Sequence, residues 1–193
     1  MGLLTVAVVG AGSMAGVEQP VLAGDGVSLR PWQVGDVEVV LAAYADPAVQ
    51  RWHCRSMTED EAREWIAGWA GQWRAEAGAS WAVTAGDRGE VTGQIGLRRV
   101  DLHEGLASVS YWTLPAARGL GVAPRALAAL AGWAFGSLGL HRMALSHSTA
   151  NPASCRVAEK AGFAAEGVKR AEGWHADGRH DMHLHARVAG DVP

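Results

Sequence analysis

Residues 111–124 read YWTLPAARGLGVAP, and this stretch decides the fold. It passes from a strand-like apolar run, through a turn with Gly119 and Gly121, into an apolar helical pattern. Glycines let a backbone approach a ligand closely, and the free amides at the start of a helix attract negative charge. Pro124 fits the first helical turn, where an N–H has no partner within the helix. The stretch therefore predicts an anion site of the pyrophosphate kind, or else a plain tight turn between strand and helix.

Apolar periodicity predicts further strands and helices on both sides of this turn. Before it we expect a strand over 27–32, a helix between Asp36 and Asp46-Pro47, a loop over 51–55 and a helix after Thr58, whose capping box includes Glu61. An antiparallel meander follows, with strands over 81–85, 91–100 and 107–114 joined by turns at 86–89 and 103–105. After the turn we expect a helix from Pro124, a strand over 143–148, a helix after Asn151-Pro152, and strands over 163–168 and 181–188.

Three tryptophans recur along one face of the second helix. Trp65, Trp69 and Trp73 are four residues apart, which places them on one side of a helix. Aromatic helix faces are usually buried in a core. The stripe therefore indicates core packing, with the wall of an amine-substrate pocket as the alternative.

The first twenty residues contain a glycine pattern that resembles a nucleotide-binding fingerprint. Gly10-Ala11-Gly12-Ser13-Met14-Ala15 has the G-x-G-x-x-A form and follows an apolar run. A dinucleotide site needs a long helix directly after the glycines, but Pro20 and the glycines at 24 and 26 leave no room for one. We therefore expect residues 1–20 to be a flexible or edge-pairing extension, residues 21–188 to form one domain, and residues 189–193 to be a tail.

Composition limits the classes of function. The 193 residues carry a net charge of −3 and are 49% apolar, which is typical of a folded domain and gives no basic surface for nucleic acid. The uncharged stretch 1–17 lacks the basic residues of a signal peptide and is too rich in glycine for a membrane span. Cys54 and Cys155 are too few for a disulfide framework. We expect a cytoplasmic protein with no nucleic-acid or membrane partner.

Several dispersed motifs resemble one family, the GNAT N-acetyltransferases. Arg118-x-x-Gly121-x-Ala123 matches the acyl-CoA signature R/Q-x-x-G-x-G/A of this superfamily. Asn151-Pro152-Ala153-Ser154, followed by residues 159–163, EKAGF, is similar to the RimJ/RimL branch, the ribosomal-protein N-terminal acetyltransferase type. Leu29-Arg30-Pro31, Asp46-Pro47, Tyr111-Trp112 and Glu166-Gly167 also fall where that branch has similar residues, so the resemblance covers about 21–188.

The resemblance implies an α/β (α+β) fold: a mixed, mostly antiparallel sheet whose central strands splay apart, flanked by helices. It implies transfer of an acetyl or other acyl group from acetyl-CoA to a primary amine of a protein N-terminus or a small molecule, with a homodimer left open. The alternative functions are a weak or inactive acyl-CoA-binding module and, more distantly, a dinucleotide oxidoreductase. The expected CoA-binding residues are Thr113, Leu114, Arg118, Gly119, Leu120, Gly121, Val122, Ala123, Asn151 and Ser154.

Catalytic roles are harder to assign because the chain departs from the family pattern. Ala158 stands where many GNAT enzymes have a tyrosine that protonates the departing thiolate, so Ser154 is the expected substitute, unless it is only a helix N-terminal residue. Asn151 is expected to contact CoA, and the alternative is that it only caps the helix that follows. A bulge near 113–115 is expected to free the backbone amide of Leu114 for the oxyanion.

The general base is also open. Ser108 stands where the branch often has an acidic residue. His53 is the first candidate, since its loop borders the acceptor cleft in this fold and imidazole titrates near neutrality, and Glu104 and His103 are alternatives.

A metal site is not expected. Asp181, His183 and His185 share one strand face, but no fourth ligand is spaced to join them. Cys155, directly after Ser154, is interpreted as a core residue.

Overall fold

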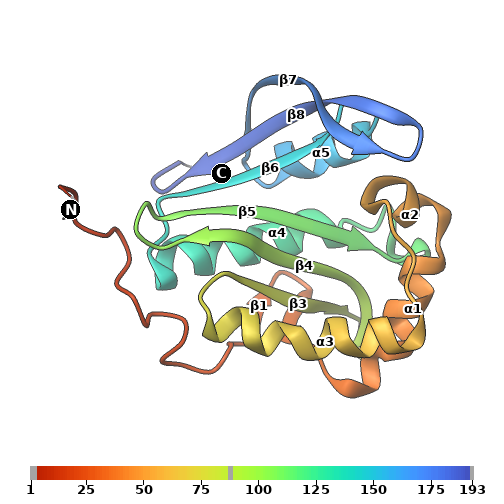
Figure 1. Ribbon diagram of the computed structural model, residues 1–193, viewed down its shortest axis with the longest axis horizontal. Coiled ribbons are helices and arrows are strands. Elements are labelled where there is room, and N and C mark those ends of the chain that lie inside the picture. Colours follow the sequence, from red (N-terminus) through yellow and green to blue (C-terminus); the bar gives the residue numbers. More distant parts are fainter. Residues whose placement is uncertain (1–3, 87–88, 192–193) are drawn as a thin grey trace.

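The computed structural model describes residues 4–86 and 89–191. It has one eight-stranded sheet in the order β1-β2-β3-β4-β5-β6-β8-β7 (Figure 1). Every neighbouring pair is antiparallel except β5 and β6, which are parallel. The strands are β1 Leu22–Gly24, β2 Val27–Pro31, β3 Gly78–Ala85, β4 Glu90–Asp101, β5 Leu106–Thr113, β6 Arg142–Ser148, β7 Ala164–His175 and β8 Gly178–Val188. The expected mixed, mostly antiparallel sheet is confirmed.

Helices cover both faces of the sheet (Figure 1). In this view, helices α4 and α5 lie behind the sheet and α3 lies in front of it. Helices α1 and α2 lie at one end. The helices are α1 Val37–Ala45, α2 Pro47–His53, α3 Glu59–Arg74, α4 Val122–Trp133 and α5 Pro152–Lys160, with short turns η1 Val34–Asp36, η2 Pro115–Ala117 and the π-helical η3 Ala134–Leu138. Among the described residues, no helix is long and apolar enough to cross a membrane.

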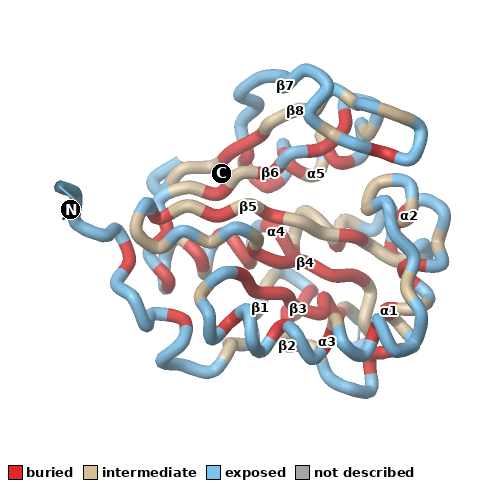
Figure 2. Tube along the Cα trace, in the orientation of Figure 1, coloured by how far each residue is buried: buried red, intermediate tan, exposed pale blue. Residues whose placement is uncertain are grey.

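Two apolar clusters hold the layers together (Figure 2). The larger cluster joins α4 and η3 to the middle of the sheet, and includes Leu127, Leu130 and Ile95, all fully buried. The smaller one joins α1, α2 and α3 around Trp112 of β5. Strand β5 is therefore packed on both faces, and this packing holds its C-terminal end in place.

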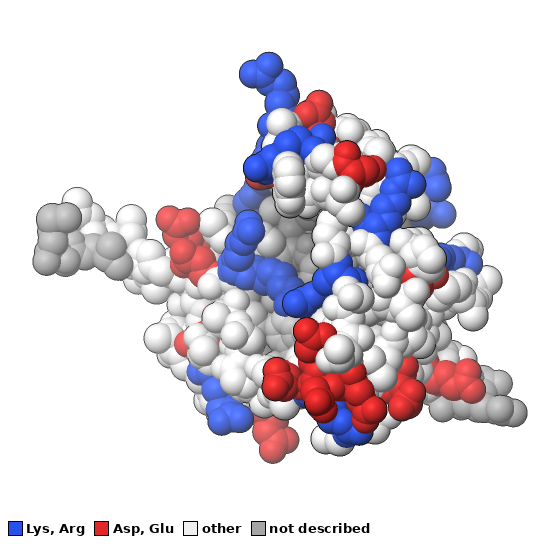
Figure 3. Space-filling view, turned by 45° about the vertical axis from the view of Figure 1, so that its right-hand side comes forward, with Lys and Arg blue, Asp and Glu red and all other residues white. Residues whose placement is uncertain are grey.

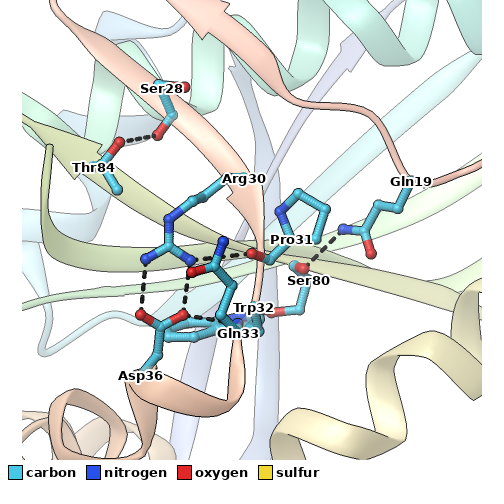
Figure 4. Close-up of polar contacts among 9 residues, drawn as sticks. All are labelled: Gln19, Ser28, Arg30, Pro31, Trp32, Gln33, Asp36, Ser80 and Thr84. Atoms are coloured by element: carbon cyan, nitrogen blue, oxygen red, sulfur yellow. Dashed lines mark hydrogen bonds and ion pairs between the residues drawn. The ribbon is translucent and has the colours of Figure 1, made fainter.

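The entry into the helices is fixed by ion pairing at the end of β2 (Figure 4). The guanidinium of Arg30 donates to both carboxylate oxygens of Asp36, at 2.7 and 2.8 Å. The same carboxylate accepts from the Gln33 amide at 2.8 Å. Although burial opposes ionisation, the Arg30 and Gln33 contacts lower the pKa of Asp36. Arg30 of the Leu29-Arg30-Pro31 motif therefore ties the end of β2 to the turn that leads into α1.

Three expected boundaries were wrong. Residues 47–53 form α2 and not only a loop, because the Asp46 carboxylate accepts from the amides of Ala48 and Val49 and so caps a helix that begins with Pro47. Strands β7 and β8 extend well beyond 163–168 and 181–188. The added residues are mostly polar and exposed, and backbone hydrogen bonds between β7 and β8 hold them in place. They show no apolar alternation from which the sequence could have predicted a strand.

Residues 5–20 form a strap that contacts the turn between β4 and β5, then Glu76, and then β3. The amides of Val8 and Val9 donate to the carbonyls of His103 and Leu102, and the side chains of Val9 and Met14 are buried. No helix follows the glycines within the described part of this segment, as expected. The amides of Gly12, Met14 and Ala15 instead donate to the carboxylate of Glu76 at 2.7–3.1 Å. The glycine motif thus binds an internal anion.

The division into extension, domain and tail stays a prediction. Residues 1–3 of the extension, Asp87 and Arg88 of the expected 86–89 turn, and residues 192–193 of the tail lie outside the described residues.

Candidate active site

The cavity opens where β5 and β6 separate. These strands pair only between residues 106–108 and 142–144, after which β5 continues over residues 109–113 and β6 over residues 145–148 without pairing to each other. The opening holds a cavity of about 580 Å³. Its walls come from the ends of β5 and β6, the turn into α4, the start of α5, and α2. A long, narrow substrate can therefore lie between two strands whose backbone groups are unpaired on that side.

The turn into α4 has the geometry of an anion cradle. Gly119 and Gly121 have φ values of 79° and 73°, in the left-handed region that favours glycine, and Gly121 is the N-cap of α4. Both glycines line the cavity, together with Val122 and Ala123. The side chain of Leu120 is 63% exposed and lies outside the lining. Gly119 and Gly121 have only backbone to present to the cavity, so the turn lets an anion come close to the main chain.

Arg118 braces this loop from below. Its guanidinium donates to the Asp46 carboxylate at 2.5 Å and to the Thr113 carbonyl at 3.2 Å. The hydrogen bond from Arg118, helped by the amides of α2, lowers the pKa of Asp46, although burial acts in the opposite direction. The ion pair links the start of α2 to the loop. Arg118 lines the cavity as expected, but its charge is already paired.

Basic side chains surround the opening (Figure 3). Arg156 and Lys160 of α5 line the cavity with Arg118, and no Asp or Glu of the described residues lines it. Figure 3 shows Lys and Arg gathered around a hollow, with acidic side chains to one side of it. The cavity therefore suits a ligand that carries several negative charges.

A tyrosine and a serine meet across the cavity. The Tyr111 hydroxyl of β5 lies 2.6 Å from Oγ of Ser154 on α5, and Ser154 is only 8% exposed. Burial raises the pKa of Tyr111 to about 12, so its hydroxyl keeps its proton at neutral pH. Both residues line the cavity. They offer one chain of hydroxyl donors to an atom that gains negative charge.

Asn151 begins α5 as its N-cap. Its Oδ1 accepts from the Ser154 amide at 3.2 Å. Asn151 also lines the cavity, so capping and ligand contact are compatible in this geometry.

Comparison with known proteins decides the family. The model of the acetyltransferase (GNAT) domain matches residues 27–164, which is most of the chain. The chain belongs to the GNAT acetyltransferase family. The resemblance to the GNAT superfamily is therefore confirmed, and the chain is an acyl-CoA-dependent N-acetyltransferase.

Named relatives agree with this family. The chain is 28% identical over 153 residues to YoaA of Bacillus subtilis, an N-acetyltransferase of uncharacterised role, covering 78% of this chain and 86% of YoaA. RimL, a ribosomal α-N-protein acetyltransferase solved with coenzyme A, superposes with a TM-score of 0.81 at 18% identity, covering 90% of this chain and all of RimL. RimJ of Mycobacterium smegmatis, solved with CoA-disulfide, gives 0.79 at 23%, covering 90% and 88%.

The expected oxyanion donor of this GNAT chain was wrong. The Leu114 amide donates to the Thr92 carbonyl at 2.9 Å, and Leu114 lies outside the cavity lining. Because donors alternate along a strand, the pairing of Leu114 with β4 turns the amides of Tyr111 and Thr113 toward the gap. No bulge reverses this order, since the register shifts of β4 and β5 lie near Arg98 and Asp101. The sequence could not fix which alternate amides are paired.

Of the three candidate bases, only His53 lies in the GNAT cavity. Its Nε2 is 3.1 Å from the Tyr111 carbonyl, which only accepts, so Nε2 carries the hydrogen and Nδ1 holds the free lone pair of the neutral ring. Burial lowers the pKa of His53 and favours that neutral form. His103 and Glu104 were wrong candidates, since they lie in the turn before β5, at the opposite end of that strand.

Sequence reasoning did not identify Tyr111 as a polar group of the GNAT site, although it is the first residue of the stretch 111–124. Strand alternation places it on the same face as Ala107 and Val109, which are buried against the helices. A buried hydroxyl on an apolar face needs a hydrogen-bond partner. This requirement could have indicated from the sequence that Tyr111 has a polar role.

The tryptophan stripe is core, as the first interpretation had it. Trp69 and Trp73 are buried, and Trp73 packs against Trp81 and Trp133 with ring centroids 6.3 and 6.0 Å away. Trp65 packs against Trp32 at 5.2 Å. No member of the stripe lines the described cavity.

The argument that no further metal ligand is available was wrong. His147 of β6 and Cys155 of α5 lie beside His183 and His185 of β8, with all four donor atoms within 4.8 Å of one another. Asp181 is outside this group, because its carboxylate accepts from the Ala171 amide. Cys155 is half-buried beside these histidines and not in the apolar core.

Proposed function

We propose that the chain transfers the acetyl group of acetyl-CoA to the α-amino group of a polypeptide N-terminus by direct attack in a ternary complex. The observation that carries this proposal is the cavity between the splayed ends of β5 and β6, which joins a glycine anion cradle to the Tyr111–Ser154 pair. The cradle and the basic residues of α5 would hold the phosphates of acetyl-CoA. Its pantetheine would run along the unpaired edge of β5.

The reaction needs few groups, and each has a place in the cavity. A neutral amine nitrogen attacks the thioester carbon, forming the C–N bond while the oxygen gains negative charge. The amides of Tyr111 or Thr113 would donate to that oxygen. The C–S bond then breaks, and the proton lost by the amine passes to His53 or to water. The Ser154 hydroxyl, backed by Tyr111, would donate a hydrogen bond to the departing sulfur.

The charge of the cavity favours an α-amino group over a polyamine. A polyamine carries several positive charges, and no carboxylate of the described residues lines the cavity to receive them. An α-amino group has a pKa of about 8, against about 10.4 for a lysine side chain, so far more of it is neutral near pH 7. A weak base such as His53 is sufficient for that amine. The name of RimL, an α-N-protein acetyltransferase, points the same way.

The test is an acceptor panel. The purified chain is incubated with acetyl-CoA and peptides of varied N-terminal residue, N-terminally blocked peptides with an internal lysine, and spermidine. Released thiol and product mass are measured. We expect one acetyl group on the free N-terminal amine, none on blocked peptides, and no acetylated enzyme when the acceptor is omitted.

Two outcomes would overturn the proposal. Acetylation of spermidine alone would assign the site to small amines. Saturable acetyl-CoA binding without acetylation of any acceptor would favour a binding module.

We also place this reaction in a reducing cytoplasm, where the free thiols of Cys54 and Cys155 persist.

A further inference from the structure

Four potential ligands meet between α5 and the sheet, and none of them has a role in the reaction proposed above, although His147 also lines the cavity. His147 lies on β6, His183 and His185 on β8, and Cys155 on α5. His147 and His183 are direct partners in the β6–β8 ladder. The donor atoms of this His/Cys cluster all lie within 4.8 Å of one another. Three separate elements therefore bring three imidazoles and one thiol to a common point.

Hydrogen bonds fix the orientation of two of these rings. Nδ1 of His147 lies 2.8 Å from the Ser148 carbonyl, and Nδ1 of His185 lies 3.3 Å from the Phe163 carbonyl. A carbonyl only accepts, so in each neutral ring Nδ1 carries the hydrogen and Nε2 holds the lone pair. Metal-binding histidines are commonly held in this way, with the other ring nitrogen donating to a carbonyl.

One of these lone pairs has no partner. Nε2 of His147 is fully buried and makes no hydrogen bond to any described residue, and the whole residue is only 6% exposed. Buried polar atoms in folded proteins are nearly always satisfied, and leaving one unpaired is costly. Nε2 of His185, a fully buried residue, faces Sγ of Cys155 at 3.6 Å. The unsatisfied nitrogen points to a ligand that accepts electron pairs.

Aromatic packing alone does not account for the cluster. The rings of His147 and His185 stack with centroids 5.2 Å apart, and His183 meets His147 edge-on at 5.5 Å. The Cys155 thiol could satisfy His185, or donate to Glu159, whose Oε1 lies 3.5 Å from Sγ. Neither arrangement gives Nε2 of His147 a donor. A cation shared by all four ligands would satisfy every lone pair at once.

We propose that His147, Cys155, His183 and His185 form a tetrahedral site for a divalent transition-metal ion, with Zn²⁺ as the expected ion. Three nitrogens and one thiolate suit the borderline softness of zinc. Zn–N bonds of about 2.0 Å and a Zn–S bond of about 2.3 Å place tetrahedral ligand atoms about 3.3–3.5 Å apart. Small side-chain rotations would bring the cluster from its present spread to that geometry.

Four protein ligands make a closed site, which is structural and not catalytic. The ion would fasten α5 to β6 and β8 beside the cavity, which His147 lines. Because α5 carries Asn151 and Ser154, the ion would hold these residues in place against the cavity. Binding would release the thiol proton of Cys155, whose pKa burial and Glu159 otherwise raise.

The test uses the full chain, stripped with a chelator under reducing conditions. Co²⁺ serves as the spectroscopic probe, because a thiolate bound to tetrahedral Co²⁺ gives a charge-transfer band and intense visible bands. Zn²⁺ then displaces it in competition. We expect one ion per chain, the charge-transfer band, and a rise in melting temperature with either metal.

A matched pair of cysteine variants locates the site. Cys155→Ser should abolish the charge-transfer band and weaken metal binding by on the order of 100-fold or more. Cys54→Ser is the control, because Cys54 also lies beside a histidine, with Sγ 3.4 Å from Nδ1 of His175. It should leave both quantities unchanged.

None of these measurements requires acetyl transfer, so they fail or succeed independently of the proposed function. A stripped chain that binds neither ion at micromolar concentration overturns the proposal. So does a band that survives Cys155→Ser or disappears in Cys54→Ser. The wild-type stoichiometry decides the matter even if a variant does not fold.

Discussion

The hydroxyls of Tyr111 and Ser154 form the smallest unit of the active site. Their 2.6 Å contact crosses from β5 to α5, so it also reports whether the two walls of the cavity are correctly placed. Because the pKa of Tyr111 is raised to about 12, the tyrosine stabilises negative charge on its neighbours as a hydrogen-bond donor and not as an anion. We therefore propose that Tyr111 supports Ser154 as the hydrogen-bond donor to the departing sulfur, in place of the acid that the family pattern would put at Ala158.

Removing either hydroxyl should lower the rate of acetyl transfer without unfolding the protein. We expect Ser154→Ala to lower kcat by about 100-fold and Tyr111→Phe by about 10-fold, with the CoA dissociation constant nearly unchanged. The double variant should resemble Ser154→Ala, because Tyr111 acts through the serine. Steady-state kinetics and melting curves measure this. Activity within about twofold of wild type would remove the pair from the mechanism, and fully multiplicative effects would show that Tyr111 does not act through the serine.

His53 should control the acid side of the pH profile. Its pKa is lowered from 6.5 by burial, so the neutral base is present at pH 7 and is lost only when the pH falls through that lowered value. Because the neutral amine attacks, we expect kcat/KM to fall with pH below the pKa of the α-amino group, about 8, and to fall more steeply below the lowered pKa of His53. In His53→Gln, kcat/KM should be lower and the steeper part of the decline should be absent. An unchanged profile in the variant would assign proton removal to water or to the acceptor itself.

At the scale of elements, the end of α3 secures the N-terminal strap. Glu76 has a φ of 55°, and its carboxylate collects the amides of Gly12, Met14 and Ala15. These amide contacts, that of Gly12 first, lower the pKa of Glu76. A glycine loop of this shape binds anions in general, and here one helix provides the anion for another segment.

The strap should loosen when this carboxylate is removed. In Glu76→Ala we expect faster hydrogen exchange over residues 8–17, with acetyl-CoA affinity retained because the strap lies away from the cavity. Because the folded-state pKa is depressed, the wild-type contacts persist above the unfolded-state pKa of about 4.3 and weaken as the pH falls through the folded value. The exposed Glu64 of α3 supplies the control, Glu64→Ala. Equal exchange in both variants would show that the contacts do not hold the strap.

Sequence patterns predicted most elements because their signals are local. The Thr58–Glu61 capping box and the apolar positions of α4 lie within a few turns of chain, and both are present as expected. The errors arose where one residue decides a long-range pairing. Leu114 could not be assigned to β4 or to the gap without the register, and Asp46, taken as a helix end, also begins α2. His147 and Cys155 join His183 and His185 only through the β6–β8 pairing and the packing of α5.

At the scale of the whole molecule, one parallel contact shapes the function. All other neighbouring strands are antiparallel and pair along most of their length, but β5 and β6 pair over three residues and then diverge. The turn into α4 and the start of α5 both lie at this opening. We therefore propose that the start of α4 receives the pyrophosphate of acetyl-CoA.

Calorimetric titration of acetyl-CoA into Ala123→Glu and Ala128→Glu tests this claim most directly. Ala123 lines the cavity in the first turn of α4, whereas Ala128 is exposed further along the same helix. A glutamate in the first turn suits the helix dipole, so folding should be preserved while its carboxylate competes for the anion site. We predict that Ala123→Glu weakens binding by about 100-fold or more and that Ala128→Glu changes it by less than about twofold. Equal affinities for the two variants would contradict the assignment of the anion site to the start of α4.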